Sequence, residues 1–331
     1  KGQRTRIQYG DKTGGVLTTT RYTYDTNTFR LLRLLTTAQN GTNILQDLQY
    51  TYDPVGNISE IRDDAYEPVF FRNQMVEPRS TYEYDAVYRL IEASGRENFH
   101  ASGAPKGFGK VEVMPTYNFG STDKALRNYT QFYEYDLASN FVTMQHIADG
   151  GGWARHYESD TRSNRLLRTW LGDDEVNAVR YEYDTHGSML NFANVAAAQH
   201  NRWDYRDMIH TLDLEGGGTA CYQYDGGKQR TFKRIDKGSI IEERIYLGGF
   251  ELYRRWRNGN TAPEEEIETH HLFADDQRVV IVEDVLMTND DRLRTGVLFR
   301  FQYSNHLGSV GLECDDTGQI ISYEEYHPYG T

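Results

Sequence analysis

Residues 50–57 read YTYDPVGN, and variants of this phrase recur along the chain. The variants are YTYDTN at 22–27, YEYD at 82–85, YEYDLASN at 133–140, YEYDTHG at 181–187 and YQYDG at 222–226. An enzyme needs a catalytic motif once, whereas a structural unit can be used many times. The recurrence therefore favours a protein built from repeats.

The phrase has the pattern of a β-hairpin. Tyr-x-Tyr places two aromatic rings on one face of a strand, because side chains alternate between the two faces. The carboxylate of Asp53 can accept hydrogen bonds from backbone N–H groups a residue or two ahead, Pro54 presets the φ of a turn, and Gly56 tolerates positive φ. An apolar residue follows each turn and is expected to restart the extended chain: Ile58, Leu90, Phe141 and Leu166.

The spacing of the phrases supports a repeat array. Asp25 and Asp53 lie 28 positions apart, and Asp85 follows 32 positions later. Degenerate copies are predicted at 157–164, which reads YESDTRSN, and at 203–207, which reads WDYRD. Irregular repeats of roughly 20–50 residues are typical of proteins in which each unit packs only on its neighbours.

The composition of the 331 residues is that of a β-rich protein without a membrane helix. The sequence has 25 tyrosines and 14 phenylalanines against 7 prolines, which favours sheet over disorder. Mean hydropathy is −0.74, and no window approaches the ~18 apolar residues that a membrane helix needs. The formal charge of −13 argues against nucleic acid or an anionic membrane as the main partner. Because the opening KGQRTRIQYG lacks an initiator methionine and a signal-peptide core, we expect an internal piece of a longer chain.

We predict a single repeat region over residues 1–331. Its parts are the first repeats at 1–94, an irregular insertion at 95–128, dense repeats at 129–234 and a terminal segment at 235–331. Glycine and proline in the insertion speak against regular strands there. Hairpins are predicted in the terminal segment around Gly248-Gly249, Asp275-Asp276 and 315–318. Helix signals are few, and the stretch VAAAQH at 195–200 is short.

Five pairs of adjacent acidic residues are candidates for catalysis. They are Glu242-Glu243, Asp275-Asp276, Asp290-Asp291, Asp315-Asp316 and Glu324-Glu325. A glycosidase needs two carboxylates that face each other about 5–10 Å apart across a sugar. Neighbouring residues on a strand point to opposite faces, so these pairs do not create that geometry. We therefore predict no catalytic residues.

The histidines show no metal-site pattern. His270 and His271 are expected to diverge on a strand, and His306 is expected to make a structural hydrogen bond. The sequence has no Asp-x-Asp-x-Asp-Gly loop of the kind that binds calcium. We therefore predict no metal ligands.

The cysteines and glycines also give no sign of a cofactor. Cys221 and Cys314 lack a metal-ligand spacing such as Cys-x-x-Cys, and small buried hydrophobic residues are the predicted role of both. Gly216-Gly217-Gly218 lacks the Lys-Ser/Thr that follows in a phosphate-binding loop. We predict no cofactor.

Three further phrases follow the repeats in order. They are YLGGFE at 246–251, NHLGS at 305–309 and YEEYHPYG at 323–330. With the YDxxGN-like phrases at Asp53 and Asp136, this ordered set resembles the Rhs/YD-repeat family. It is most similar to the Rhs shell region of the B and C components of insecticidal toxin-complex (Tc) proteins. The resemblance covers nearly the whole chain, and 95–128 is its weakest part.

The resemblance implies an all-β fold. Repeated antiparallel hairpins would form a long curved sheet, here an open segment of a hollow shell that encloses a C-terminal toxin. In the family the shell continues past the PYG phrase into a segment with aspartyl self-cleavage activity. This sequence stops at Thr331, before any such motif, so no protease residue can be carried over.

The resemblance predicts a secreted, non-enzymatic structural segment. Its partners would be the remaining shell and toxin-complex components and the enclosed toxin polypeptide, with no nucleic acid and no membrane contact. An open edge strand would also permit self-association. Two alternatives stay open: a carbohydrate-binding or adhesion module on a tyrosine-rich curved sheet, and a glycoside hydrolase.

Overall fold

The computed structural model describes residues 2–10, 13–38, 41–99, 125–214, 216–289 and 295–329. Within these residues, nearly all regular structure is β-strand, arranged in a twelve-stranded sheet, an eleven-stranded sheet and a two-stranded hairpin. Within each of the two large sheets, each strand pairs antiparallel with the next one along the chain, except that β5 pairs with β8 because the small hairpin β6–β7 is set aside. The predicted all-β fold of repeated antiparallel hairpins is confirmed.

The first sheet contains twelve of the described strands. They are β1 (Arg6–Gly10), β2 (Val16–Tyr24), β3 (Leu31–Ala38), β4 (Asn43–Tyr52), β5 (Ile58–Asp63), β8 (Arg79–Tyr84), β9 (Leu90–Asn98), β10 (Leu126–Tyr135), β11 (Phe141–Ala148), β12 (Gly151–Ser159), β13 (Leu166–Leu171) and β14 (Val179–Arg180). The separate hairpin consists of β6 (Val69–Phe71) and β7 (Gln74–Val76). Strands β5, β9, β11 and β13 begin at the four apolar residues that the sequence pattern predicts.

The second sheet contains eleven of the described strands. They are β15 (Asn201–Trp203), β16 (Ile209–Asp213), β17 (Thr219–Tyr224), β18 (Arg230–Asp236), β19 (Ile240–Leu247), β20 (Phe250–Arg257), β21 (Glu265–Ala274), β22 (Gln277–Met287), β23 (Gly296–Ser304), β24 (Val310–Cys314) and β25 (Ile320–Tyr323). The three predicted terminal hairpins are confirmed as β19–β20, β21–β22 and β24–β25.

The described helices are short. The 3-10 helix η3 (Glu175–Asn177) and the α-helix α1 (Ala197–His200) lie between the two sheets along the chain. The weak helix signal at 195–200 therefore corresponds to a single turn. None of the helices in the described ranges has the length and apolar character to cross a membrane.

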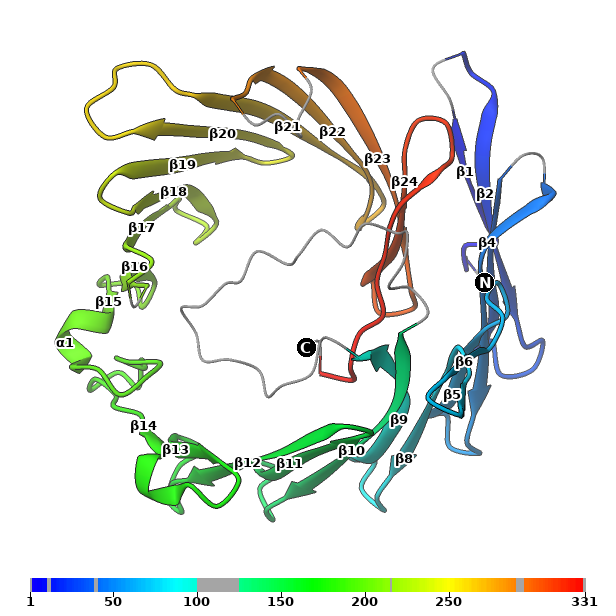
Figure 1. Ribbon diagram of the computed structural model, residues 1–331, viewed down its shortest axis with the longest axis horizontal. Helices are drawn as coiled ribbons and strands as arrows, with labels where there is room; N and C mark the ends of the chain where they lie inside the picture. Colours follow the sequence, from blue (N-terminus) through cyan, green and yellow to red (C-terminus); the bar gives the residue numbers. More distant parts are fainter. Residues whose placement is uncertain are drawn as a thin grey trace.

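The two sheets follow one another around an open, ring-shaped wall (Figure 1). The chain passes from β14 to β15 on one side of the ring, and on the other side β24 comes to lie beside β1 and β2 (Figure 1). The C-terminus lies inside the ring. A right-handed twist that accumulates from strand to strand makes a wide sheet curl in this way.

A hydrophobic cluster closes the ring where the first and last strands meet. We call this cluster the joint: Tyr9, Ala38, Leu45, Val280, Phe301, Tyr303, Leu312 and Cys314. The hydroxyl groups of Thr18 and Tyr303 lie 2.7 Å apart within it, and the Tyr9 hydroxyl donates to the Gln302 carbonyl at 3.1 Å. The joint therefore brings residues almost 300 positions apart into one core.

The cysteine prediction is confirmed for one residue and wrong for the other. Cys314 is fully buried in the joint, where burial raises the pKa of its thiol to about 12. Cys221 is only half-buried, because it lies on the more exposed face of β17, opposite to the face that buries Ala220.

Regular strands extend into both ends of the predicted irregular insertion at 95–128, so these boundaries are wrong. Strand β9 continues to Asn98 and β10 begins at Leu126, with the two ends paired. Gly95 is tolerated in β9 because the ring of Tyr129, its partner across the strands, covers it; a Cβ at Gly95 would lie 2.8 Å from the Tyr129 hydroxyl. Residues 100–124 lie outside the described part of the chain.

Candidate functional site

The second tyrosine of most of the phrases links neighbouring hairpins. Its hydroxyl donates to the carbonyl of the residue that restarts the chain after the preceding turn, and we call this contact the tyrosine staple. The staples are Tyr52 to Leu31 (2.7 Å), Tyr84 to Ile58 (2.9 Å), Tyr135 to Leu90 (2.7 Å), Tyr183 to Leu166 (2.8 Å), Tyr224 to Ile209 (2.9 Å) and Tyr326 to Val310 (2.6 Å). Tyrosine therefore recurs at this position because each copy makes the same hydrogen bond to the neighbouring hairpin.

The aspartate of each phrase organises its turn, with a longer reach than the sequence analysis expects. One carboxylate oxygen of Asp136 accepts hydrogen bonds from the backbone N–H groups of Ala138 and Asn140, two and four residues ahead. The Asn140 side chain donates to the other oxygen at 2.8 Å, and these bonds lower the pKa of Asp136. The reach is longer because the turn spans five residues, and Asn140 returns to pair with Asp136 through the backbone.

The NHLGS phrase contains the same turn with asparagine in place of aspartate. The Asn305 side-chain oxygen accepts hydrogen bonds from the N–H groups of Leu307 and Ser309, at 2.9 and 3.1 Å. Because asparagine offers the same acceptor geometry without the charge, NHLGS is a further copy of the repeat turn.

An arginine after several turns reaches the next turn along the wall. Its guanidinium donates to the carbonyl of the next repeat aspartate, as in Arg30 to Asp53 (3.2 Å), Arg89 to Asp136 (2.9 Å) and Arg206 to Asp225 (2.7 Å). Arg89 also lies over the ring of Tyr135, 4.9 Å from its centroid. The sequence analysis did not identify these arginines, although a basic residue in or just after several of the turns is a readable signal.

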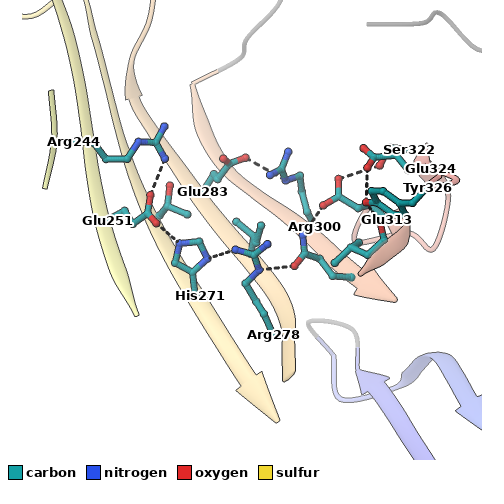
Figure 2. A pocket seen from close by; sticks show the side chains of 14 residues that line it. Arg244, Glu251, His271, Arg278, Glu283, Arg300, Glu313, Ser322, Glu324 and Tyr326 are labelled. Carbon is teal, nitrogen blue, oxygen red and sulfur yellow. Dashed lines mark hydrogen bonds and ion pairs between the residues drawn. The ribbon is translucent and has the colours of Figure 1, made fainter. Parts of the chain in front are cut away.

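A charged groove of about 440 Å³ lies on the second sheet (Figure 2). Its side chains come from strands β19 to β25 and from the segment that follows β25. Glu251 accepts from Arg244 at 2.7 Å and lies 3.0 Å from His271, and Gln302 joins Arg278 to Glu313. Burial alone would raise the pKa of Glu251, but the contacts with Arg244 and His271 outweigh it and lower the pKa.

Arginine and glutamate alternate across four strands elsewhere on the same sheet. Arg234, Glu243, Arg254 and Glu266 stand opposite one another on β18 to β21, and we call this row the charge ladder. Arg234 pairs with Glu243, and Arg254 with Glu266 at 2.7 Å. Opposite charges placed directly across a sheet stabilise its register.

The last described residues cross from the second sheet to the first. We call residues 324–329 the C-terminal strap. Glu325 accepts from the buried guanidinium of Arg96, and the Tyr329 hydroxyl lies 2.7 Å from that of Tyr135. The Tyr329 ring packs edge-on against Tyr133, with the centroids 5.1 Å apart. The strap thus holds the last strands against the middle of the first sheet.

The strap also completes a buried cluster of a carboxylate and two imidazoles. Glu97 on β9 lies 3.2 Å from His146 on β11 and 3.2 Å from His327 in the strap. Arg127 contacts the same carboxylate at 2.6 Å. Sequence reasoning missed this cluster because Glu97 lies 49 positions from His146 and 230 from His327, so no spacing signal exists.

The adjacent acidic pairs occupy structural positions in the described part of the chain. Glu242 pairs with Lys237 and Glu243 with Arg234 on opposite faces of β19, as the alternation of strand side chains predicts. In the pair Asp275-Asp276, Asp275 forms an ion pair with Arg4. In the pair Asp315-Asp316, the Asp315 carboxylate accepts hydrogen bonds from backbone N–H groups of its own turn. Both carboxylates therefore have structural partners. The pair Asp290-Asp291 lies outside the described residues.

The three predicted histidines do not come together. His270 packs against Phe250 while His271 contacts Glu251, so the two diverge as expected. The buried Nδ1 of His306 does not make the expected hydrogen bond among the described residues, and the ring packs edge-on against Tyr50. The reason is that the turn places this ring in the core beside Tyr50, and burial lowers its pKa.

Comparisons with known proteins identify relatives over the whole chain. No family model matches it. Toxin subunits YenC1 and YenC2 of Yersinia entomophaga are 31% and 33% identical over 349 and 348 residues, and each alignment covers 99% of this chain. The alignments cover 33% and 34% of those subunits, so the chain spans about a third of the length of the curated relatives it matches.

Solved structures agree with these relatives. The crystal structure of TcdB2-TccC3 matches with a TM-score of 0.78 and 29% identity, over 100% of this chain and 16% of that one. A Photorhabdus luminescens Tc holotoxin pore matches with a TM-score of 0.75 and 28% identity, over 99% and 16%. The tyrosine-staple hairpins, the long curved sheets and these matches show that the chain is homologous to Tc toxin subunits and has the fold of the Rhs shell region of Tc toxin-complex components.

Proposed function

We propose that the chain is a non-enzymatic wall segment of a secreted toxin-complex shell that encloses a toxin polypeptide until delivery. The observation that carries this proposal is the joint. It packs β1, β3 and β4 against β22 to β24, although the two sheets are separate hydrogen-bonded units. A strip that curls and packs onto its own start surrounds a space, which is what a container wall requires.

The chemistry of the groove supports a wall better than a reaction centre. Its charged side chains already have partners, as Figure 2 shows: Arg244 pairs with Glu251, Arg300 with Glu283, and Gln302 joins Arg278 to Glu313. Groups that are paired in this way offer little binding energy to a ligand, because each new contact would replace an existing one. A glycosidase would need one carboxylic acid held protonated, whereas the Arg244 and His271 contacts keep Glu251 ionised.

Sugar binding would use a different surface. A stacking platform needs several aromatic rings exposed on one hollowed face. The described lining of the groove has one tyrosine, Tyr326, and its hydroxyl is bonded to Val310 and Glu324. A glycan array provides the test of this alternative, since measurable binding that is lost on Tyr-to-Ala changes would favour it over a container.

Protection from protease in the complete subunit tests the container. Leu312 is fully buried in the joint, whereas Leu307 lies in the NHLGS turn and is 76% exposed. Leu312→Asp places a charge in the joint and should open the wall. We expect the enclosed polypeptide to resist added protease in the unaltered subunit and in Leu307→Asp, and to be degraded in Leu312→Asp. Equal degradation in all three proteins would refute enclosure.

A further inference from the structure

Glu97, His146 and His327 present three potential metal-ligating atoms to one another inside the ring. Their ligand atoms all lie within 4.8 Å of one another. We propose that these residues form a zinc site that fastens the C-terminal strap to the first sheet. The ligands come from β9, from β11 and from the strap, so a bound ion would connect segments that the staples do not connect directly.

The spacing of the ligand atoms fits a tetrahedral ion. Zinc bonds of about 2.1 Å at tetrahedral angles place neighbouring ligand atoms about 3.4 Å apart. The Glu97 carboxylate oxygens lie 3.2 Å from His146 Nε2 and 3.2 Å from His327 Nε2. The two contacts use different oxygens of Glu97, Oε1 and Oε2, and the three ligand atoms lie within 4.8 Å of one another. Binding therefore requires ligand atoms to move together by up to about 1.4 Å.

Surrounding side chains hold the ligands in place. His146 is 4% exposed, and its ring stacks between Tyr129 and Trp153. The buried amide of Gln131 lies 3.2 Å from His146 Nδ1 and also contacts the Tyr133 hydroxyl. The amide nitrogen of Gln131 faces Nδ1, and its oxygen accepts from the Tyr133 hydroxyl. An ion at Nε2 therefore requires the amide to turn over, so that its oxygen accepts from Nδ1–H and Nε2 offers its lone pair.

The positive charge of Arg127 repels a zinc ion, and the position of its guanidinium reduces that repulsion. Its guanidinium, 3% exposed, contacts Oε1 of Glu97, while Oε2 faces His327. The arginine charge makes the site weaker than a four-ligand structural zinc site.

The donor set selects the ion. Two imidazole nitrogens and one carboxylate oxygen suit zinc, whereas calcium and magnesium take oxygen ligands. His327 is the most accessible of the three, at 22% exposed, so the ion can enter from the strap side and a water molecule can take the fourth position.

Zinc titration of the full chain against a competing chromophoric chelator tests the site. The variant is His327→Gln, which lies outside the strands and keeps a hydrogen-bonding group beside Glu97. The matched control is His271→Gln, because His271 also contacts a glutamate, Glu251, at 3.0 Å, but without a second imidazole. We expect one zinc per chain in the unaltered protein and in the control, and an affinity at least ~10-fold lower in His327→Gln.

Two further readouts separate a zinc site from an ion-pair cluster. Cobalt bound at the site should give the visible absorption of a tetrahedral centre, and zinc should slow hydrogen exchange in the strap while magnesium does not. Circular dichroism shows whether each variant is folded. Absence of zinc uptake, or uptake that depends on His271 instead of His327, would overturn the proposal.

Discussion

The two sheets build one continuous wall from different cross-strand chemistry. In the first sheet, strands β2 to β4 each bury consecutive residues, many of them polar, so both faces are covered there, and the Thr20 and Thr36 hydroxyls bond each other at 2.9 Å. In the second, strands β18 to β20 are half-buried along almost their whole length and carry the charge ladder. Burial by a second layer permits small neutral pairs, whereas a strand wetted on both faces needs charged pairs to stay soluble and in register.

Breaking the joint should have the largest effect, because both sheets depend on it. Leu312→Ala removes a fully buried side chain, and we expect the free energy of unfolding to fall by about 2–5 kcal/mol. Denaturant titration measures this change. Leu307→Ala in the exposed turn is the control and should change stability by less than about 0.5 kcal/mol. Equal effects of the two variants would show that the joint does not couple the sheets.

One carboxylate on each sheet makes the stability of the protein depend on pH, and the two act in opposite directions. Asp63 on β5 is 5% exposed, and burial raises its pKa from 3.8 to about 6, despite hydrogen bonds from the N–H groups of Asp47 and Ala65. A raised pKa means that its contribution is fully present below about pH 4 and is lost as the pH rises through 6. We expect Asp63→Asn to be more stable than the unaltered chain at pH 7, by up to about 3 kcal/mol, and similar at pH 4.

Glu251 on the second sheet should change stability with pH in the opposite direction to Asp63. Its pKa lies below 4.5 because the Arg244 and His271 contacts outweigh burial. Its contribution is therefore present above pH 4.5 and is lost as the pH falls, so Glu251→Gln should lose stability at pH 7 and lose less in acid. Unfolding curves at several pH values measure both variants, and slopes of the same sign would contradict the contrast.

A single tyrosine staple should contribute less than the joint. Tyr52→Phe keeps the ring and removes the hydrogen bond to the Leu31 carbonyl, and we expect a loss of about 1 kcal/mol. The control is Tyr205→Phe, whose ring is 88% exposed and which is not a staple residue. Thermal unfolding measures the difference, and a Tyr52→Phe protein as stable as the control would show that the staple hydroxyl is dispensable.

The charge ladder should show the smallest effect and the strongest dependence on salt. Arg254→Gln removes the pair with Glu266, in which the arginine side chain is 40% exposed. We expect a loss of about 0.5 kcal/mol at low salt that disappears near ~1 M salt. The loss in Tyr52→Phe should not change over the same salt range, since its bond joins two neutral groups. A loss in Arg254→Gln that does not depend on salt would contradict an electrostatic role of the charge ladder.

The local structure of the repeats could be predicted well from sequence. The restart of strands at Ile58, Leu90 and Phe141 follows from turn chemistry that acts over five residues. The insertion boundary could not be placed, because what extends β9 is the Tyr129 ring over Gly95, a contact between strands on either side of a long segment. The candidate zinc ligands could not be found for the same reason, since Glu97 and His327 meet only after the ring has curled.

The amino-acid sequence by itself determined that the chain folds as successive hairpins, because alternation, turn formation and the tyrosine staple each involve residues close along the chain or in the next repeat. Only the tertiary structure decided which distant strands come into contact. The joint, the strap and the Glu97 cluster arise when accumulated strand twist returns the last strands to the first. Twist is a property of every strand and of no particular residue, so its sum over two sheets leaves no motif in the sequence.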